Sequence, residues 1–283
     1  MAPLCGAVLA YRSLDMKHYD PARKTIADFG EQWTTYVDNE GRYGSREYFF
    51  DIVSPLLTPE EVNDASVADI GSGTGRIVLM LIDAGARIVH AVEPSNALEV
   101  VKQNTKSFAD RIVYHHARGD ELPSGLDLDL VVSIGVIHHI PEPQPVMRAA
   151  FNALRPGGRC VVWLYGHEGN ETYLAIFEPL RRITARLPHW ILAGLSHLLN
   201  IVASGYAWLC RWVKLPLADY MRRVFSTLSW HKRFLVIYDQ LNPAYAKYYT
   251  CEEARALFVE AGFVDVTLHH RHGYSWTVAG RKP

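Results

Sequence analysis

The sequence predicts an α/β protein built on a doubly wound, seven-stranded sheet, with an antiparallel C-terminal hairpin and a helical cap insertion. Short apolar runs alternate with helical patterns over residues 66–166. A long helical stretch interrupts this alternation at 170–249, and one helix and two strands then close the chain. Strands separated by helices require right-handed crossovers, so the first five strands should be parallel and covered on both faces.

The strands are predicted from apolar runs that end at glycine or proline, such as "SVADIG" and "ARIVHAVEP". The helices are predicted from apolar residues at helical spacing, with a Ser-Asn cap before one of them and glycine after others. The expected strands are 66–70, 86–94, 111–117, 127–136, 159–166, 264–273 and 274–282, and the expected helices are 75–85, 95–108, 144–158 and 250–263. A short turn at Gly273 should make the last two strands an antiparallel pair.

Composition and charge narrow the class of protein. The chain has 283 residues and a formal net charge of −1, so bulk charge does not indicate a nucleic-acid partner. Its four cysteines are far apart and form no Cys-x-x-Cys pair, so we expect no zinc site or redox dithiol and a cytoplasmic location. The N-terminal apolar run has no basic lead and is not expected to be a signal peptide. The predicted units are a covering segment at 1–60, a ligand-binding core at 61–169, the cap at 170–249 and a closing helix and hairpin at 250–283.

Three alternating glycines follow the first predicted strand. Gly71, Gly73 and Gly75 come directly after Asp69, and Glu93 ends the second strand. Glycine allows positive φ and close approach of a ligand, and the following helix presents free N–H groups. A carboxylate at the second strand can accept bonds from ribose hydroxyls, which a dinucleotide site would also provide. The spacing differs from the G-x-G-x-x-G of dinucleotide sites, and a tight turn without a ligand is the remaining alternative.

The motifs "VADIGSGTG", "AVEPS", "ARGDELPSGLDLDLVVSIGVIHHI" and "ALRPGGRCVVW" occur in one order over residues 66–166. In this order they resemble the class I S-adenosylmethionine (SAM)-dependent methyltransferases, which have a Rossmann-like fold. The resemblance implies that SAM is the cofactor and that its methionine, ribose and adenine groups contact a defined set of residues. That set is Asp69, Gly71, Ser72, Gly73, Gly75, Glu93, Pro94, Asp120, Glu121, Ser133, Ile134 and Gly135.

Histidines and acids follow the fourth and fifth strands, at the sheet edge where α/β proteins bind ligands. His138 and His139 come after the fourth strand; His138 is a candidate catalytic residue, and the alternative is that the pair only packs. His167 and Glu168 follow the fifth strand and are candidate catalytic residues. A carboxylate that faces aromatic rings suits carbon methylation, because rings stabilise a carbocation and the carboxylate removes the proton.

The insertion should decide the substrate. It is rich in aromatic and basic residues, which line either a helical core or a tunnel for an amphiphile with an anionic head. Tyr173 and Arg182 belong to this candidate substrate set. The stretch from Trp190 to Cys210 carries no charged residue. We expect it to form a buried cap helix pair, with membrane-surface contact and a membrane span as the less favoured alternatives.

The segments "GHEGNETY" and "HHRHGYSW" and the tryptophan-bearing insertion are similar to those of geranyl diphosphate C6-methyltransferases. This resemblance implies carbon methylation of a prenyl diphosphate in terpene biosynthesis, with Mg²⁺ bound through the diphosphate, Glu168 as the base and Trp208 in the prenyl pocket. The alternatives are an O-methyltransferase of a sugar, lipid-linked or phenolic acceptor and a SAM-binding protein that transfers nothing. A nicotinamide-dependent reductase would need a different glycine spacing and a Tyr-x-x-x-Lys pair.

Two further segments could contact a small-molecule substrate. Trp33 and Tyr48 lie in the aromatic stretch 28–50, which either folds over the cofactor or packs on the sheet edge. His270 and His272 point to the same side of a strand, which suits contact with a diphosphate or hydrogen bonding beside the site. No protein-bound metal is expected from the sequence, and the oligomeric state is not predicted.

Overall fold

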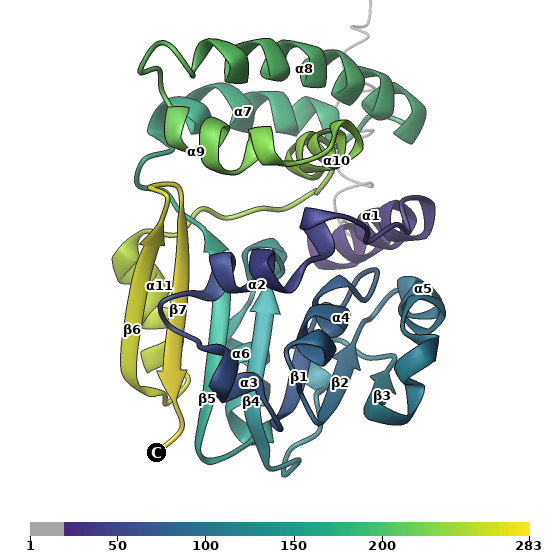
Figure 1. Ribbon diagram of the computed structural model, residues 1–283, viewed down its shortest axis with the longest axis vertical. Coiled ribbons are helices and arrows are strands. Elements are labelled where there is room, and N and C mark those ends of the chain that lie inside the picture. The colour runs from purple at the N-terminus through teal and green to yellow at the C-terminus, as the bar shows by residue number, and fades with distance from the viewer. Residues whose placement is uncertain (1–19) are drawn as a thin grey trace, which may run out of the picture.

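The computed structural model describes residues 20–283 and contains one seven-stranded sheet (Figure 1). The strand order is β3-β2-β1-β4-β5-β7-β6, with β7 antiparallel to both of its neighbours. The strands are β1 (Ser66–Ile70), β2 (Ile88–Val92), β3 (Ile112–His115), β4 (Leu128–Ile134), β5 (Leu154–Tyr165), β6 (Val264–Arg271) and β7 (Ser275–Arg281). This topology confirms the predicted doubly wound sheet with its antiparallel C-terminal hairpin. Because the order reverses between β1 and β4, a ligand crevice is expected at their carboxyl ends.

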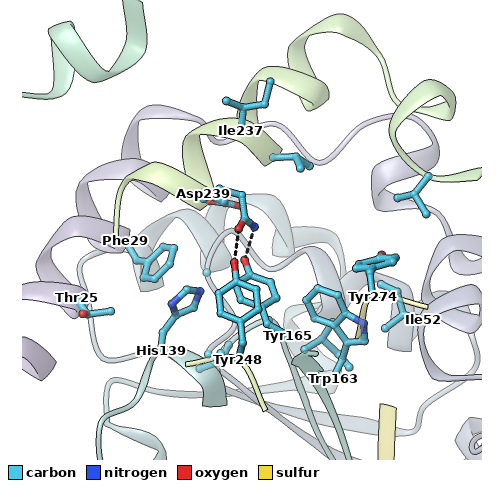
Figure 2. A pocket seen from close by; sticks show the side chains of 18 of the residues that line it. Thr25, Phe29, Ile52, His139, Trp163, Tyr165, Ile237, Asp239, Tyr248 and Tyr274 are labelled. Carbon is cyan, nitrogen blue, oxygen red and sulfur yellow. Dashed lines mark hydrogen bonds between the residues drawn. The ribbon is translucent and has the colours of Figure 1, made fainter. Parts of the chain in front are cut away.

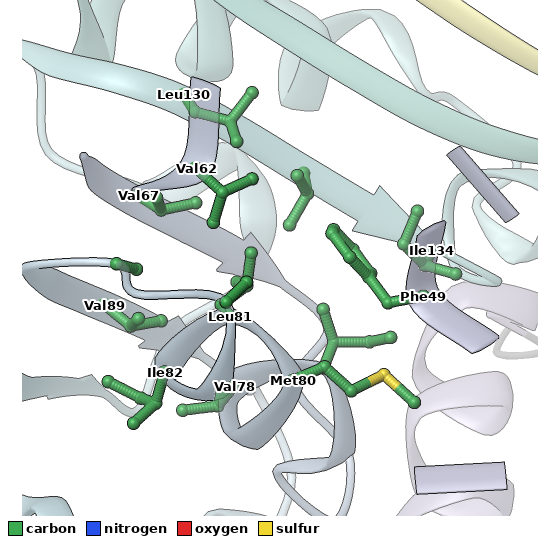
Figure 3. Close-up of a cluster of buried hydrophobic side chains, with 14 of the residues drawn as sticks. Phe49, Val62, Val67, Val78, Met80, Leu81, Ile82, Val89, Leu130 and Ile134 are labelled. Carbon is green, nitrogen blue, oxygen red and sulfur yellow. The ribbon is translucent and has the colours of Figure 1, made fainter. Parts of the chain in front are cut away.

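Helices cover both faces of the sheet and form two apolar cores. One core packs α2 (Arg46–Val53), α4 (Arg76–Asp83) and α5 (Ala97–Asn104) against β1 and β2; Figure 3 shows Phe49, Met80, Leu81 and Val89 from it. The other packs α6 (Gln144–Ala153) and α11 (Cys251–Val259) against β4, β5 and β7. These buried β-branched strands and one-sided helices are what the sequence pattern predicted.

Two element boundaries differ from the prediction for local reasons. The helix expected at 95–108 ends at Asn104, and the Thr105 hydroxyl donates to the Val101 carbonyl at 2.7 Å. A 3₁₀ segment, Lys106–Arg111, follows it. The helix expected at 144–158 ends at Ala153, and β5 begins at Leu154. Pro156 favours extended backbone in the preceding residue, so the chain leaves the helix earlier than its apolar pattern suggests.

Four cap helices lie over the carboxyl ends of the parallel strands (Figure 1). They are α7 (Glu171–Thr184), α8 (His189–Leu209), α9 (Ala218–Arg223) and α10 (Trp230–Leu241). Helices α7, α8 and α10 share a small core around Phe234 and Tyr238. Helix α1 (Pro21–Thr35) lies below α10, and the short α3 is Pro59–Val62. The remaining 3₁₀ segments are Arg42–Gly44, Gly119–Glu121, Ile137–His139 and Phe225–Thr227.

Helix α8 is not the buried cap helix that its sequence suggested. Its inner side packs Leu192 and Leu195 in the cap core and also buries Ser196 and Asn200, whereas other apolar residues of α8 and of the following turn face outward. We call this set the outer face of α8; its members are 42–77% exposed and are Trp190, Leu198, Ile201, Val202, Trp208, Leu209, Trp212 and Val213. Within residues 20–283, α8 is the one helix that is long and apolar enough to cross a membrane by length and composition.

Candidate active site

The glycine turn after β1 is shaped by positive φ and by close packing. Gly71, Gly73 and Gly75 have φ of +81°, +53° and +78°. A Cβ on Gly71 would lie 2.4 Å from a methyl carbon of Val136, so a larger residue does not fit there. Gly75 begins α4, whose first N–H groups therefore face the crevice. The turn leaves its backbone open to a ligand, as predicted from the glycine spacing.

The carboxylate of Glu93 is fixed beside this turn at the end of β2. Its Oε2 accepts from the Gly73 N–H at 2.9 Å, and its Oε1 accepts from the Ser95 N–H at 3.0 Å. Burial raises the pKa of Glu93, and these hydrogen bonds offset part of that rise. Glu93 lines the cavity, so its position suits the predicted contact with ribose hydroxyls.

We expect Glu93→Ala to weaken SAM binding by about 2–3 kcal/mol, because charge-assisted bonds to the cofactor and to the turn are lost. Calorimetric titration of the purified protein with SAM measures this change. Glu99→Ala, which alters an exposed carboxylate on α5, is the matched control and should bind normally. Unchanged affinity in a folded Glu93→Ala protein would place the cofactor elsewhere.

Asp69 is a buried carboxylate that has no partner. It is 1% exposed, and neither side-chain oxygen has a hydrogen bond among residues 20–283. Burial raises its pKa to about 7. Its side chain lies behind the turn and does not line the cavity. An unpaired buried carboxylate favours a nearby cation, so this position suits a ligand that carries an amino group.

A cavity of about 750 Å³ runs from the glycine turn to the cap helices. Its lower end is formed by predicted cofactor residues, namely Gly71, Ser72, Gly73, Glu93, Pro94, Asp120, Ile134 and Gly135. Its upper end is formed by apolar residues of α8 to α10, including Leu199, Val202, Phe225, Val236 and Ile237. Aromatic rings surround the middle, among them Phe29, Trp33, Tyr48, Trp163, Tyr165, Tyr173 and Tyr248. The cavity therefore joins a polar cofactor end to an apolar acceptor end.

Four predicted cofactor residues do not line the cavity. Asp69 and Gly75 lie behind the turn, and the Ser133 hydroxyl donates to the Ile70 carbonyl at 3.1 Å. Glu121 is exposed and accepts from the Arg118 N–H at 2.8 Å. Asp120 does line the cavity, where Arg118 holds its carboxylate through two hydrogen bonds. The adenine contact predicted for this segment can therefore come from Asp120, whereas Glu121 only closes the local turn.

His139, rather than the predicted His138, faces the cavity (Figure 2). His139 Nδ1 lies 2.9 Å from the Tyr245 carbonyl. A carbonyl only accepts, so Nδ1 carries the proton and Nε2 keeps a free lone pair. Burial lowers the pKa of His139 to about 4, so its ring is neutral near pH 7. His138 is fully buried against Tyr165, with ring centroids 3.7 Å apart, which makes it a packing residue.

A cluster of hydroxyl groups lies beside His139 (Figure 2). Tyr173 and Tyr248 each donate to Gln240 Oε1 at 2.9 Å. Gln240 Nε2 donates to the Tyr165 hydroxyl, also at 2.9 Å, which leaves the Tyr165 proton free to donate. Burial raises the pKa of Tyr165 well above its usual value, so the hydroxyl stays protonated. The cluster is a fixed hydrogen-bond donor among the aromatic rings in the middle of the cavity.

Asp239 is a second polar group in the cavity that the sequence did not single out. It lies on α10, and the Gln32 side-chain amide of α1 donates to its Oδ1. The same Gln32 accepts from Asn242 Nδ2 at 3.0 Å, so α1 and α10 are bound to each other. Burial raises the pKa of Asp239 to about 7. No local motif marks Asp239, because its place in the cavity depends on how the cap packs.

The predicted base Glu168 does not face the cavity. Its carboxylate accepts from the Cys251 N–H at 2.8 Å and from Trp276 Nε1 at 3.0 Å. Partial burial opposes ionisation, but these hydrogen bonds outweigh it and lower the pKa of Glu168. The side chain connects the start of α11 to β7, and this position does not support the predicted role as a base. His167 is exposed and also lies outside the cavity lining.

We expect Glu168→Gln to reduce the free energy of unfolding by about 1–3 kcal/mol, because a buried donor loses its carboxylate partner. Cofactor affinity and turnover should stay near the wild-type values, since the Glu168 side chain does not line the cavity. Thermal unfolding and steady-state rates measure the two effects. Glu171→Gln, an exposed change in the same segment, serves as the control. A large loss of turnover at unchanged stability would restore the role as base.

Three other predicted substrate residues lie outside the cavity. Trp208 is 60% exposed on the outer face of α8, so it does not shape an internal pocket. His270 stacks on Trp276, and His272 Nε2 lies 3.3 Å from Asp51 Oδ1. Arg271, between the two histidines, points inward instead and is 2% exposed. β6 ends at Arg271, and His272 lies in the hairpin turn with a φ of +50°, where it contacts the same Asp51 carboxylate as Arg271. The strand alternation that the sequence suggested therefore does not extend to His272.

The remaining predicted substrate residues are Trp33, Tyr48, Tyr173 and Arg182. Trp33, Tyr48 and Tyr173 line the cavity. Trp33 lies over the glycine turn. A Cβ added to Gly73 would be 3.3 Å from its indole ring. The side chain of Arg182 lies outside the described part of the structure.

The arginines of the cavity lining are already engaged. Arg118 pairs with Asp120, Arg271 pairs with Asp51, and Arg76 lies over the Tyr43 ring at 4.1 Å. Among residues 20–283 no group of three or more His, Cys, Asp or Glu side chains is placed to hold a metal ion. The described lining thus offers neither a free cation nor a metal site for a diphosphate.

Comparison with known proteins supports the class of this domain. Residues 68–162 match the family described as a methyltransferase domain. A ubiquinone biosynthesis O-methyltransferase of Hydrogenovibrio crunogenus is 23% identical over 176 residues, which are 57% of this chain and 68% of that protein. A tRNA U34 carboxymethyltransferase of Hahella chejuensis is 28% identical over 162 residues, 56% of this chain and 48% of that protein. The chain spans about half the length of several curated relatives that it matches.

The fold is also shared with a solved structure. Magnesium protoporphyrin IX methyltransferase from Synechocystis PCC 6803, with bound SAH, has a TM-score of 0.55 at 14% identity, covering 93% of this chain and 100% of that chain. The chain therefore carries a SAM-dependent methyltransferase domain, as its motifs predicted. The open glycine turn and the fixed Glu93 fit SAM, whose sulfonium supplies an electrophilic methyl group when it is bound.

Proposed function

We propose that this protein methylates a hydroxyl oxygen of an apolar, phenolic acceptor. The observation that carries the proposal is the lining of the cavity beyond the glycine turn. Aromatic and aliphatic side chains form its walls, and its uncharged polar groups gather around His139 and Tyr165. Such a site binds an apolar body through its walls and orients one polar atom through a few fixed groups.

His139 and Tyr165 supply the two contacts that a hydroxyl acceptor needs. The free lone pair of His139 Nε2 can accept the proton of the acceptor hydroxyl. The free proton of the Tyr165 hydroxyl can donate to the same oxygen and fix its direction. Phe29, whose ring centroid lies 4.8 Å from that of His139, helps to exclude water from this position. The proton of the hydroxyl would thus move to His139 as the oxygen is methylated.

Carbon methylation of a prenyl diphosphate is less well supported by this geometry. The Glu168 side chain is bound by Cys251 and Trp276 and does not line the cavity, and the lining arginines are paired or stacked. A sugar would leave most of its hydroxyls without partners against aromatic walls, which costs binding energy. An RNA acceptor is not supported either, because the net charge of −1 offers no basic surface in bulk. The O-methyltransferase named among the relatives agrees with transfer to oxygen.

Incubation with SAM that carries an isotopically labelled methyl group tests the proposal. The acceptor panel contains alkylated and prenylated phenols, monosaccharides, and geranyl and farnesyl diphosphate with Mg²⁺. Mass spectrometry should find the label on the oxygen of an apolar phenol. Product from the diphosphates or sugars alone would overturn the proposal. Tight SAM binding without turnover of any acceptor would favour a non-catalytic SAM-binding protein.

A further inference from the structure

Helix α8 differs from a typical surface helix because it carries apolar residues on both its inner and its outer side. Ser196 and Asn200 are fully buried, and Asn200 Nδ2 donates to the Trp230 carbonyl at 3.0 Å. The outer face of α8 carries Leu, Ile, Val and Trp side chains toward solvent. A surface helix normally turns its apolar stripe to the core and its polar residues outward. A large exposed apolar patch on one side of a helix marks a contact surface.

The outer face of α8 has tryptophans near both ends and cations beside them. Trp190 lies near its start, and Trp208 and Trp212 lie near its end, with exposures of 76%, 60% and 77%. Arg186 precedes the face, and Arg211 and Lys214 follow it; all three are exposed. No acidic residue occurs between Glu178 and Asp219. Tryptophan favours the water–lipid boundary, and lysine and arginine are attracted to anionic headgroups.

The cavity is connected to this same helix. Leu199, Val202, Ala203 and Tyr206 of α8 line its upper end. Val202 is also 62% exposed, so one side chain belongs both to the cavity wall and to the outer face of α8. An apolar molecule that leaves a lipid layer beside α8 would therefore reach the cavity without crossing the polar surface of the sheet domain.

We infer that the outer face of α8 docks on an anionic lipid surface, with α8 lying in the plane of the headgroups. Partition of its Trp, Leu, Ile and Val side chains supplies the apolar part of the binding, and Arg186, Arg211 and Lys214 supply the electrostatic part. The docking itself does not depend on the proposed acceptor. Docking on lipid would also explain why the end of the cavity next to the cap helices is apolar.

A second copy of the chain is a poorer partner for this face. A two-fold axis pairs one patch with itself, so α8 would pack against α8. Both ends of α8 are basic, with Arg186 at the start and Arg211 and Lys214 at the end. Parallel and antiparallel pairings both bring cations near cations, and no acidic residue between 179 and 218 compensates them. A lipid surface with anionic headgroups complements both ends at once.

Vesicle sedimentation of the full chain tests this inference. Vesicles of equal parts phosphatidylcholine and phosphatidylglycerol should bind the protein more tightly than vesicles of phosphatidylcholine alone. The double variant Trp208→Ser/Trp212→Ser should weaken binding at least about tenfold, since two large rings no longer partition. Arg211→Gln/Lys214→Gln should weaken binding to the anionic vesicles by about fivefold for each cation removed.

Val259→Ser is the matched control, because Val259 is 55% exposed on α11, outside the cap. It should bind both kinds of vesicle like the wild type. Absence of sedimentation with either vesicle, or equal binding by the tryptophan double variant, would overturn the inference. Analytical ultracentrifugation provides the other decisive outcome: a dimer that the tryptophan double variant converts to monomer would make this face a contact between copies.

Discussion

His139→Asn is expected to reduce turnover by about 10²- to 10⁴-fold, the usual contribution of a general base. The asparagine amide can still donate to the Tyr245 carbonyl, as His139 Nδ1 does, but it has no group in place of Nε2. SAM affinity should stay near the wild-type value, because the glycine turn and Glu93 are unchanged. Release of demethylated cofactor with the best acceptor of the panel measures the loss.

The pH dependence of the same reaction identifies the base. Burial lowers the pKa of His139 to about 4, so its neutral form persists as the pH falls from 8 to about 5. We therefore expect no loss of rate near pH 6.5, where an exposed histidine would gain its proton. His167→Asn, at an exposed position, should have no effect. A loss of rate below about pH 7 that disappears in Asp239→Asn would assign the base to Asp239 instead.

Gly71→Ala is expected to abolish measurable cofactor binding. Backbone strain and overpacking together should raise the free energy of the binding-competent turn by roughly 2–5 kcal/mol. The new Cβ would lie 2.4 Å from a Val136 methyl carbon, at a φ of +81°. Either the turn or Val136 must move, and the Gly73 N–H then loses its position opposite Glu93. Calorimetric titration with SAM measures the loss, and circular dichroism confirms that the protein is folded.

Gly125→Ala separates the two causes of this effect. Gly125 has a similar φ of +71°, but a Cβ there would meet nothing within 4 Å. This control should lose only about 1–2 kcal/mol of stability through backbone strain and should bind SAM normally. If Gly71→Ala binds SAM as well as Gly125→Ala does, close packing at the turn is not what shapes the cofactor site.

Local pattern was enough to predict the sheet and the cofactor end of the cavity. Buried strands, turn glycines and helix ends are properties of short segments. The elements β1, α4 and β2 could therefore be predicted from their own residues and their immediate neighbours. Gly71, Gly73 and Glu93 line the cavity because they follow the carboxyl ends of β1 and β2, which are adjacent parallel strands. The differences in helix length at Asn104 and Ala153 came from single residues, Thr105 and Pro156, that compete with the helical pattern.

The acceptor end was predicted less well because side-chain direction there depends on packing. His138 and His139 are neighbours, yet only His139 faces the cavity. His270 and His272 flank Arg271, and the strand turns Arg271 inward instead. In a strand, a prediction that is wrong by one residue names a side chain on the other side of the sheet. Sequence alone located the right segments but not the right residues within them.

The sequence by itself determined the fold, the cofactor class and the place of the glycine turn, because these depend on short-range backbone geometry and burial. Only the tertiary structure decided that Glu168 is bound by Cys251 and Trp276 and that Asp239 enters the cavity. It also decided that α8 leaves one of its apolar sides exposed. The physical reason is that these facts depend on how the cap packs on the sheet, and that packing joins segments that are remote in the chain.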